Sequence, residues 1–177
     1  MKKFFKILLG VFTFIFVGLV ATMLILGKEY HFERKITINA PVDKVWENVN
    51  SVKAINQWNP WLKIDPNMKM EFSGTSGQVG DSYSWESKNP DAGKGKQTIT
   101  GLHPKTLVNT DLTFYMPEES KAKADIKLIP QGNQTEVIWT LDSTFEYPSN
   151  LMKLFFDSFM DAPYTEGLKK LKEISEK

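Results

Sequence analysis

Aromatic side chains are the most conspicuous candidates for a binding site in this 177-residue sequence. One set falls at positions that strand or helix periodicity turns inward: Trp58, Trp61, Tyr83, Trp85, Phe114, Trp139, Phe155 and Phe159. Rings of this size can fill a core or line an apolar pocket, and both interpretations are open for each ring. Tyr83 also carries a hydroxyl that needs a partner when buried, which makes it the best candidate to donate a hydrogen bond to a ligand.

Acid–base catalysis would require a carboxylate or an imidazole inside an apolar pocket, where desolvation raises a carboxyl pKa. The candidates are Glu86, His103, Asp111 and Asp157. Glu86 and Asp111 alternate away from neighbouring aromatic residues, His103 precedes a proline in a turn, and Asp157 can face solvent. We therefore expect none of these carboxylates to face a pocket, and the sequence predicts no catalytic residue.

Charge and composition exclude several other kinds of site. The chain holds 22 Lys and Arg against 21 Asp and Glu, a balance that argues against binding to nucleic acid. It contains no Cys and two His, so we expect no disulfide, no metal site and no cofactor held by such ligands.

An apolar segment near the N-terminus favours a membrane anchor. The run from Ile7 to Leu26 carries no charge and spans about 30 Å as a helix, the thickness of a bilayer core. A cleaved signal peptide is the alternative, but the possible cleavage points place Leu19 or Ile25 where a small residue is needed. The sequence thus predicts a retained anchor over residues 1–27 and a globular domain over residues 28–177.

The orientation of this anchor follows from the flanking charges. Lys2, Lys3 and Lys6 precede the apolar run. Basic residues favour the cytoplasmic side of a membrane, so we expect a single-pass protein with a cytoplasmic N-terminus and an extracytoplasmic domain.

Hydrophobic periodicity predicts an α+β domain. Residues 30–39 resemble a strand, and helical spacing follows from Pro41 and again over residues 52–58. Alternating patterns then predict about six strands, including one unbroken strand over residues 120–129. A long helix begins near Ser149 or Asn150, either of which could cap it, and its first half is apolar on nearly every side. A curved antiparallel sheet around this terminal helix would bury that half.

Several motifs resemble the START-like (SRPBCC) superfamily, and within it the polyketide cyclase/dehydrase-like branch. They are Ile38-Asn39-Ala40-Pro41-Val42-Asp43-Lys44-Val45-Trp46, Trp58-Asn59-Pro60-Trp61 and Gly77-Gln78-Val79-Gly80-Asp81. The resemblance covers about residues 32–175 and implies a helix-grip fold, with a cavity between sheet and terminal helix for apolar or amphipathic small molecules. We expect no second, effector-binding domain of the kind joined to some membrane-anchored relatives.

Three functions are compatible with these features. The first is a membrane-anchored module that binds a hydrophobic or amphipathic small molecule in this cavity. The second is a cyclase-like or hydrolase-like enzyme acting on an apolar substrate with a buried carboxylate or Tyr83. The third is an interaction module with a filled interior. In the first, Phe155 and Phe159 would form the cavity wall opposite Tyr83, Trp85 and Trp139.

Overall fold

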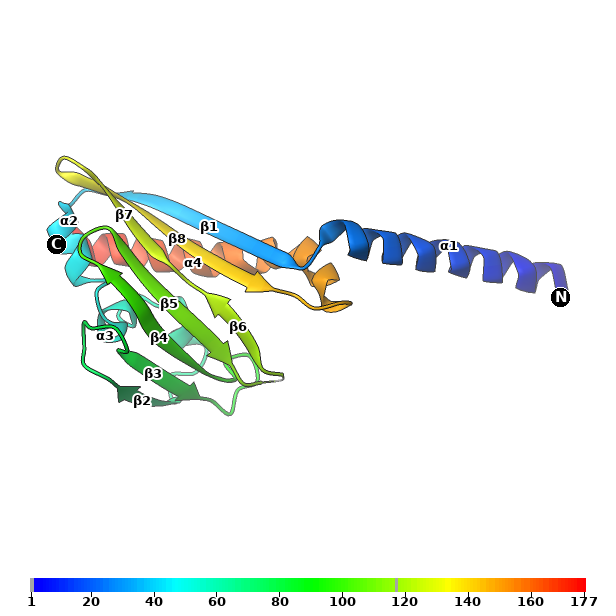
Figure 1. Ribbon diagram of the computed structural model, residues 1–177, viewed down its shortest axis with the longest axis horizontal. Coiled ribbons are helices and arrows are strands. Elements are labelled where there is room, and N and C mark those ends of the chain that lie inside the picture. Colours follow the sequence, from blue (N-terminus) through cyan, green and yellow to red (C-terminus); the bar gives the residue numbers. More distant parts are fainter. Residues whose placement is uncertain (1, 117) are drawn as a thin grey trace.

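A single antiparallel sheet and one long helix make up the domain, and the computed structural model describes residues 2–116 and 118–177. The helix α4 lies against the sheet, and α1 extends away from it along the long axis of the molecule (Figure 1). The strands are ordered β1-β8-β6-β5-β4-β3-β2, with β7 paired to β5 and β8. This is the predicted α+β helix-grip arrangement.

The elements follow the chain in a simple order. The helical elements are α1 (Lys2–Leu26), α2 (Val42–Glu47), α3 (Val52–Ile55), η1 (Pro60–Lys63), η2 (Ser149–Met152) and α4 (Lys153–Ser175). The strands are β1 (Glu29–Ile38), β2 (Lys69–Ser73), β3 (Ser82–Glu86), β4 (Lys94–His103), β5 (Leu107–Phe114), β6 (Ser120–Lys123), β7 (Ile126–Gln131) and β8 (Gln134–Thr144).

The predicted strand over residues 120–129 is two strands, β6 and β7. The break falls at Ala124 and Asp125, where the Ala124 amide donates to Thr110 O and the Asp125 carboxylate accepts from the Asn109 side chain. The inward alternation nevertheless continues across the break, since Ala122, Ala124, Ile126 and Leu128 are all buried. The face of each residue was therefore predicted correctly, although the strand boundaries were not.

Two expectations about helix ends were wrong. The helix expected over residues 52–58 ends at Ile55, because Asn59 begins the separate turn η1 by accepting a hydrogen bond from the Trp61 amide. The terminal helix starts after the 3-10 turn η2, and neither Ser149 nor Asn150 caps it. The Asn150 side chain instead donates to the backbone of Met23 and Gly27 at the end of α1.

The second half of α4 packs into the core, whereas the first half is partly open. Tyr164, Leu168 and Leu171 are buried under the sheet. Phe155 is 75% exposed and Phe159 is 61% exposed, so the prediction that the sheet encloses the apolar first half was wrong. The sequence showed the apolar character of this segment, but the sheet covers only the side that carries Phe156.

A group of four rings, which we call the core stack, joins α4 to the sheet. Trp139 stacks on Tyr164 with 3.9 Å between ring centroids, Trp58 meets Trp139 edge-on at 4.9 Å, and Phe32 meets Tyr164 at 5.2 Å. The Tyr164 hydroxyl donates to Thr140 O at 3.3 Å. Burial raises the pKa of this hydroxyl, so Tyr164 stays protonated.

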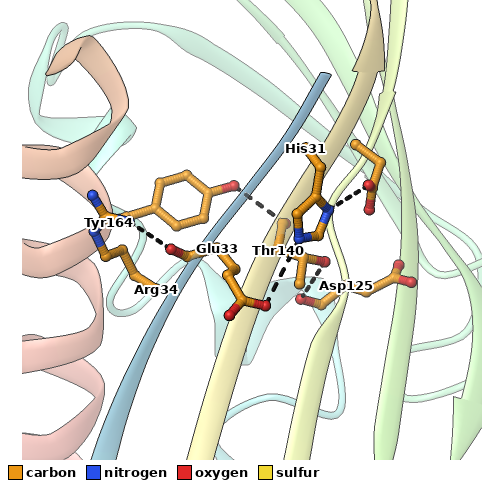
Figure 2. A network of polar contacts seen from close by, with 7 residues as sticks. His31, Glu33, Arg34, Asp125, Thr140 and Tyr164 are labelled. Carbon is orange, nitrogen blue, oxygen red and sulfur yellow. Dashed lines mark hydrogen bonds and ion pairs between the residues drawn. The ribbon is translucent and has the colours of Figure 1, made fainter. Parts of the chain in front are cut away.

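Polar contacts lie on both sides of β1. Figure 2 shows Tyr164 and Arg34 on the α4 side of this strand and His31 on the opposite side. Arg34 Nε donates to Asp161 Oδ1 of α4 at 2.6 Å, and His31 Nδ1 lies 2.6 Å from Asp142 Oδ1 of β8. The hydrogen bond to Asp142 is the largest cause that raises the pKa of His31 above its ordinary value of 6.5.

This pKa predicts a small pH dependence of stability. A raised pKa in the folded state means that protonated His31 stabilises the fold fully below about pH 6.5, and that this contribution is lost as the pH rises through the folded-state pKa. Because the side chain is half-exposed, the effect should stay below about 1 kcal/mol. In the parent protein the free energy of unfolding should fall slightly as the pH rises through neutrality. His31→Gln should remove this pH dependence. An imidazole that titrates at or below its ordinary pKa in NMR spectra would contradict the assignment.

Candidate functional site

The segment Trp58-Asn59-Pro60-Trp61 contains two of the predicted site residues and contacts a third, Tyr83. Trp58 enters the core stack, and its indole Nε1 donates to Asn48 O at 2.8 Å. The Asn59 side chain accepts from the Trp61 amide and donates from Nδ2 to the Tyr83 hydroxyl oxygen at 3.2 Å. Pro60 packs against Gly167 of α4, where an added Cβ would lie 3.1 Å from Pro60 Cδ. This turn therefore links the core, the sheet and the terminal helix.

Trp61 belongs to a group of aromatic rings around the first half of α4, which we call the helix cluster. Its members are Tyr30, Trp61, Phe145, Phe156 and Phe159, with successive ring centroids 5.1–6.0 Å apart. Phe156 packs on Tyr30 and Phe145, while Phe159 packs on Phe156 and Trp61. The Phe156 side is partly buried, and the Phe159 side is open to solvent.

A second group, the sheet cluster, lies on β2, β3 and β5. It consists of Phe72, Tyr83, Trp85 and Phe114, with neighbouring centroids 5.5–6.0 Å apart. Gly95 leaves room for the Trp85 ring, because a Cβ there would lie 2.4 Å from Trp85 Cζ2 and 2.6 Å from Thr113 O. The Trp85 indole also donates to Ala92 O at 3.0 Å. Trp85 and Phe114 are partly exposed and pack against the same buried core as Trp61.

Burial separates the predicted site residues into two kinds. Trp58, Tyr83 and Trp139 are only 2%, 4% and 6% exposed, so neighbouring atoms surround each ring. Rings packed this closely help to fill the core, and a contact between these three and a ligand stays a prediction. Trp61, Trp85, Phe114 and Phe159 keep part of their surface open. Phe155 is open but belongs to neither cluster, so the expected wall of Phe155 and Phe159 opposite Tyr83, Trp85 and Trp139 is not formed.

Two of the hollows in the structure lie away from α4. One of about 560 Å³ is open and runs along α1 beside Gly10 and Thr13. The other, of about 520 Å³, lies over β5, β6 and β8 among charged side chains such as Asp111, Lys123 and Asp142. Beside α4, the exposed rings of Phe155 and Phe159 form an open apolar surface.

The carboxylates considered for catalysis lie at the surface, as predicted. Glu86 pairs with Lys94 at 3.2 Å, Asp111 is exposed, and Asp157 accepts a hydrogen bond from the Tyr30 hydroxyl at 2.8 Å. Burial raises the pKa of the Tyr83 hydroxyl and keeps it protonated, which removes it as a general base. Within residues 2–116 and 118–177, no three His, Asp or Glu side chains gather where they could hold a metal ion.

One buried carboxylate was missed by the sequence analysis. Asp81 Oδ2 accepts hydrogen bonds from the Val52 amide at 3.1 Å and from the Gly77 amide at 3.0 Å. These bonds tie the loop before β3 to the start of α3, so the carboxylate is committed to backbone donors. The resemblance motif that ends at Gly80-Asp81 was the signal that could have indicated a fixed loop.

The architecture and the aromatic clusters define a START-like, Bet v1-like protein. Residues 29–176 match the family of polyketide cyclase / dehydrase and lipid transport proteins, and the chain belongs to that family. No relative among curated proteins matches the sequence.

Solved structures agree with this fold. Norcoclaurine synthase from Thalictrum flavum is 12% identical, with a TM-score of 0.63, over 84% of this chain and 88% of the enzyme. A Bacillus halodurans protein is 15% identical, with a TM-score of 0.61, over 85% of this chain and 99% of its own. A Rhizobium loti protein is 16% identical, with a TM-score of 0.60, over 82% and 96% of the two chains. At these identities the likeness establishes the fold alone.

Proposed function

We propose that this protein is anchored in a membrane by α1 and binds a hydrophobic or amphipathic small molecule, without transforming it, on the open face beside α4. Residues 1–27 form the anchor and residues 28–177 the binding domain. Trp61 and Phe159 of the helix cluster contact the ligand there. We also assign to the site Trp85 and Phe114, the partly exposed rings of the sheet cluster, and the buried rings of Trp58, Tyr83 and Trp139 support it. The family description, which includes lipid transport, agrees with a ligand of this class.

The open side of the helix cluster is the observation that carries this proposal. Phe159 is 61% exposed although it lies beside Trp61 and Phe156, which are partly buried. A cluster of aromatic rings that keeps part of its surface open to solvent forms an apolar patch, and such patches often mark binding sites. An apolar ligand laid against them would remove that surface from water at about 25 cal/mol per Å².

The anchor is supported by the length and composition of α1. It is the one helix among the described residues that is long and apolar enough to cross a membrane, a test that a signal sequence also passes. Thr13 and Thr22 donate their hydroxyls to the carbonyls of Leu9 and Gly18, so the few polar side chains are satisfied within the helix. Lys2, Lys3 and Lys6 favour a cytoplasmic N-terminus and an extracytoplasmic domain.

The enzymatic alternative lacks comparable support. A buried acid or base near the aromatic face would favour it. The buried carboxylate of Asp81 is occupied by two backbone amides, and Asp157 is held by Tyr30 at the surface. Binding without transformation is therefore the function that these residues support best.

Truncation of Phe159 should separate binding from stability. In a chain that lacks residues 1–27, Phe159→Ala should weaken the binding of an apolar fluorescent probe by about 1 kcal/mol, which is about fivefold in Kd. Its unfolding free energy should change little, because the side chain is largely exposed. Titration of the probe and chemical denaturation measure the two quantities.

Val79→Ala is the matched control for this experiment. Val79 is 64% exposed and lies between β2 and β3 in the sequence. Figure 1 shows the loop that joins these strands at the end of the domain away from α1. Truncation of Val79 should leave both probe affinity and stability unchanged. Equal weakening by the two variants, or no probe binding by the parent chain, would refute the proposed site.

A further inference from the structure

Side chains from η2 and from the start of α4 bind the last carbonyl groups at the end of α1. Asn150 Nδ2 donates to Met23 O at 2.6 Å and to Gly27 O at 2.9 Å, and Lys153 Nζ donates to Leu26 O at 2.8 Å. The last carbonyls of a helix have no partner within it and attract a cation, so these bonds join the two elements. The domain is thus held directly at the end of α1 and not on a free linker.

Exposed apolar side chains surround this joint. Met152, Leu154 and Phe155 are each more than half exposed. Nearby, Lys28 Nζ lies 5.1 Å from the centroid of the exposed Tyr147 ring. Aromatic and basic side chains at the end of an apolar span are typical of the boundary between a bilayer and water.

The direction of α4 and its rise per residue determine how far these side chains would lie from the hydrocarbon core of a bilayer. Figure 1 shows α4 running away from α1 along the long axis of the molecule. At about 1.5 Å per residue, Phe155 lies about 3 Å beyond Lys153 along the helix and Phe159 about 9 Å beyond it. With Leu26 at the edge of the hydrocarbon core, a headgroup layer of about 5–8 Å contains Phe155 and ends near Phe159.

We infer that the first half of α4 docks on the surface of the bilayer that holds α1, with Met152, Leu154 and Phe155 in the headgroup layer. This inference rests on the proposed membrane anchor. The same docking brings the open side of Phe159 and the helix cluster to the bilayer surface. An apolar molecule dissolved in the membrane then reaches the rings without crossing water, so the ligand class is one that partitions into bilayers.

Site-specific quenching in vesicles tests this docking. The chain contains no cysteine, so the single substitutions Val11→Cys, Phe155→Cys and Val79→Cys each give one site for a bimane fluorophore. The full-length variants are reconstituted into phosphatidylcholine vesicles that contain lipids with a nitroxide near the headgroup. The Val11 site reports insertion of α1, the Phe155 site reports docking, and the Val79 site is the exposed control.

We expect strong quenching of the bimane fluorescence at Val11, comparable quenching at Phe155 and no quenching at Val79. Quenching at Val11 without quenching at Phe155 would overturn the docking and leave the anchor intact. An unquenched Val11 site would overturn the anchor and the docking together. Equal quenching at Phe155 and Val79 would show nonspecific adsorption and would also contradict the docking.

The joint supplies a second test. Lys153→Met keeps the length of the side chain but removes the ammonium group that binds the end of α1. In the Phe155→Cys background it should reduce quenching at Phe155, whereas quenching at Val11 in the corresponding background should persist. Lys169→Met, at an exposed position in the second half of α4, should change neither signal. Unchanged quenching in Lys153→Met would contradict the role of the joint.

Discussion

Replacing Trp139 with alanine should lower the free energy of unfolding by about 3–5 kcal/mol, because it opens a large cavity in a packed core. The ring lies between Trp58 and Tyr164, and it also borders Gly167, where an added Cβ would approach Trp139 Cζ3 to 2.9 Å. Neighbours packed this tightly cannot collapse into the space without shifting α4. Denaturant unfolding of the parent and variant measures the difference.

Phe155→Ala is the matched comparison for this substitution. It removes a large ring from the same helix-grip domain, but the ring is 75% exposed. We expect a change within about 0.5 kcal/mol in solution. Similar losses for the two variants would show that Phe155 is buried in solution, and a small loss for Trp139→Ala would show that the core stack is loosely packed.

Replacing Asp81 with alanine should cost about 2–4 kcal/mol. The Val52 amide would lose its acceptor in a buried setting and the Gly77 amide in a partly buried one, and an unpaired buried donor costs about 1–3 kcal/mol. Asp81→Asn keeps a side-chain oxygen and should recover part of the loss. Asp111→Ala, at an exposed position of β5, should have little effect on unfolding. Equal effects of the two alanine substitutions would refute the structural role of Asp81.

Alternation and turn residues were enough to predict the sheet. Ala122, Ala124, Ile126 and Leu128 face inward on β6 and β7 because side chains alternate along an extended chain whether or not its ladder is interrupted. The same patterns predicted the order of the elements and a sheet curved around the terminal helix, which the family resemblance then identified as a helix-grip fold. Both depend on local spacing, which a single sequence displays directly.

The candidate site was only partly predictable, because burial depends on neighbours that a single sequence does not display. Trp139 and Phe159 are both large aromatic residues at positions predicted to face inward. Trp139 is enclosed between two rings, whereas Phe159 faces solvent. Asn150 fits the pattern of a helix cap, but its side chain binds α1 instead of α4. Each of these outcomes is set by a contact between segments far apart in the chain.

Photolabelling with a fatty acid that carries a diazirine on its acyl chain tests most directly whether the face beside α4 binds an apolar ligand. The chain lacking residues 1–27 is irradiated with the probe, and the modified residues are located by mass spectrometry of its peptides. We expect saturable labelling at Trp61, Trp85, Phe114 and Phe159, which excess unlabelled fatty acid suppresses. Labelling that does not saturate, or that falls mainly on the charged hollow over β5, β6 and β8, would contradict it.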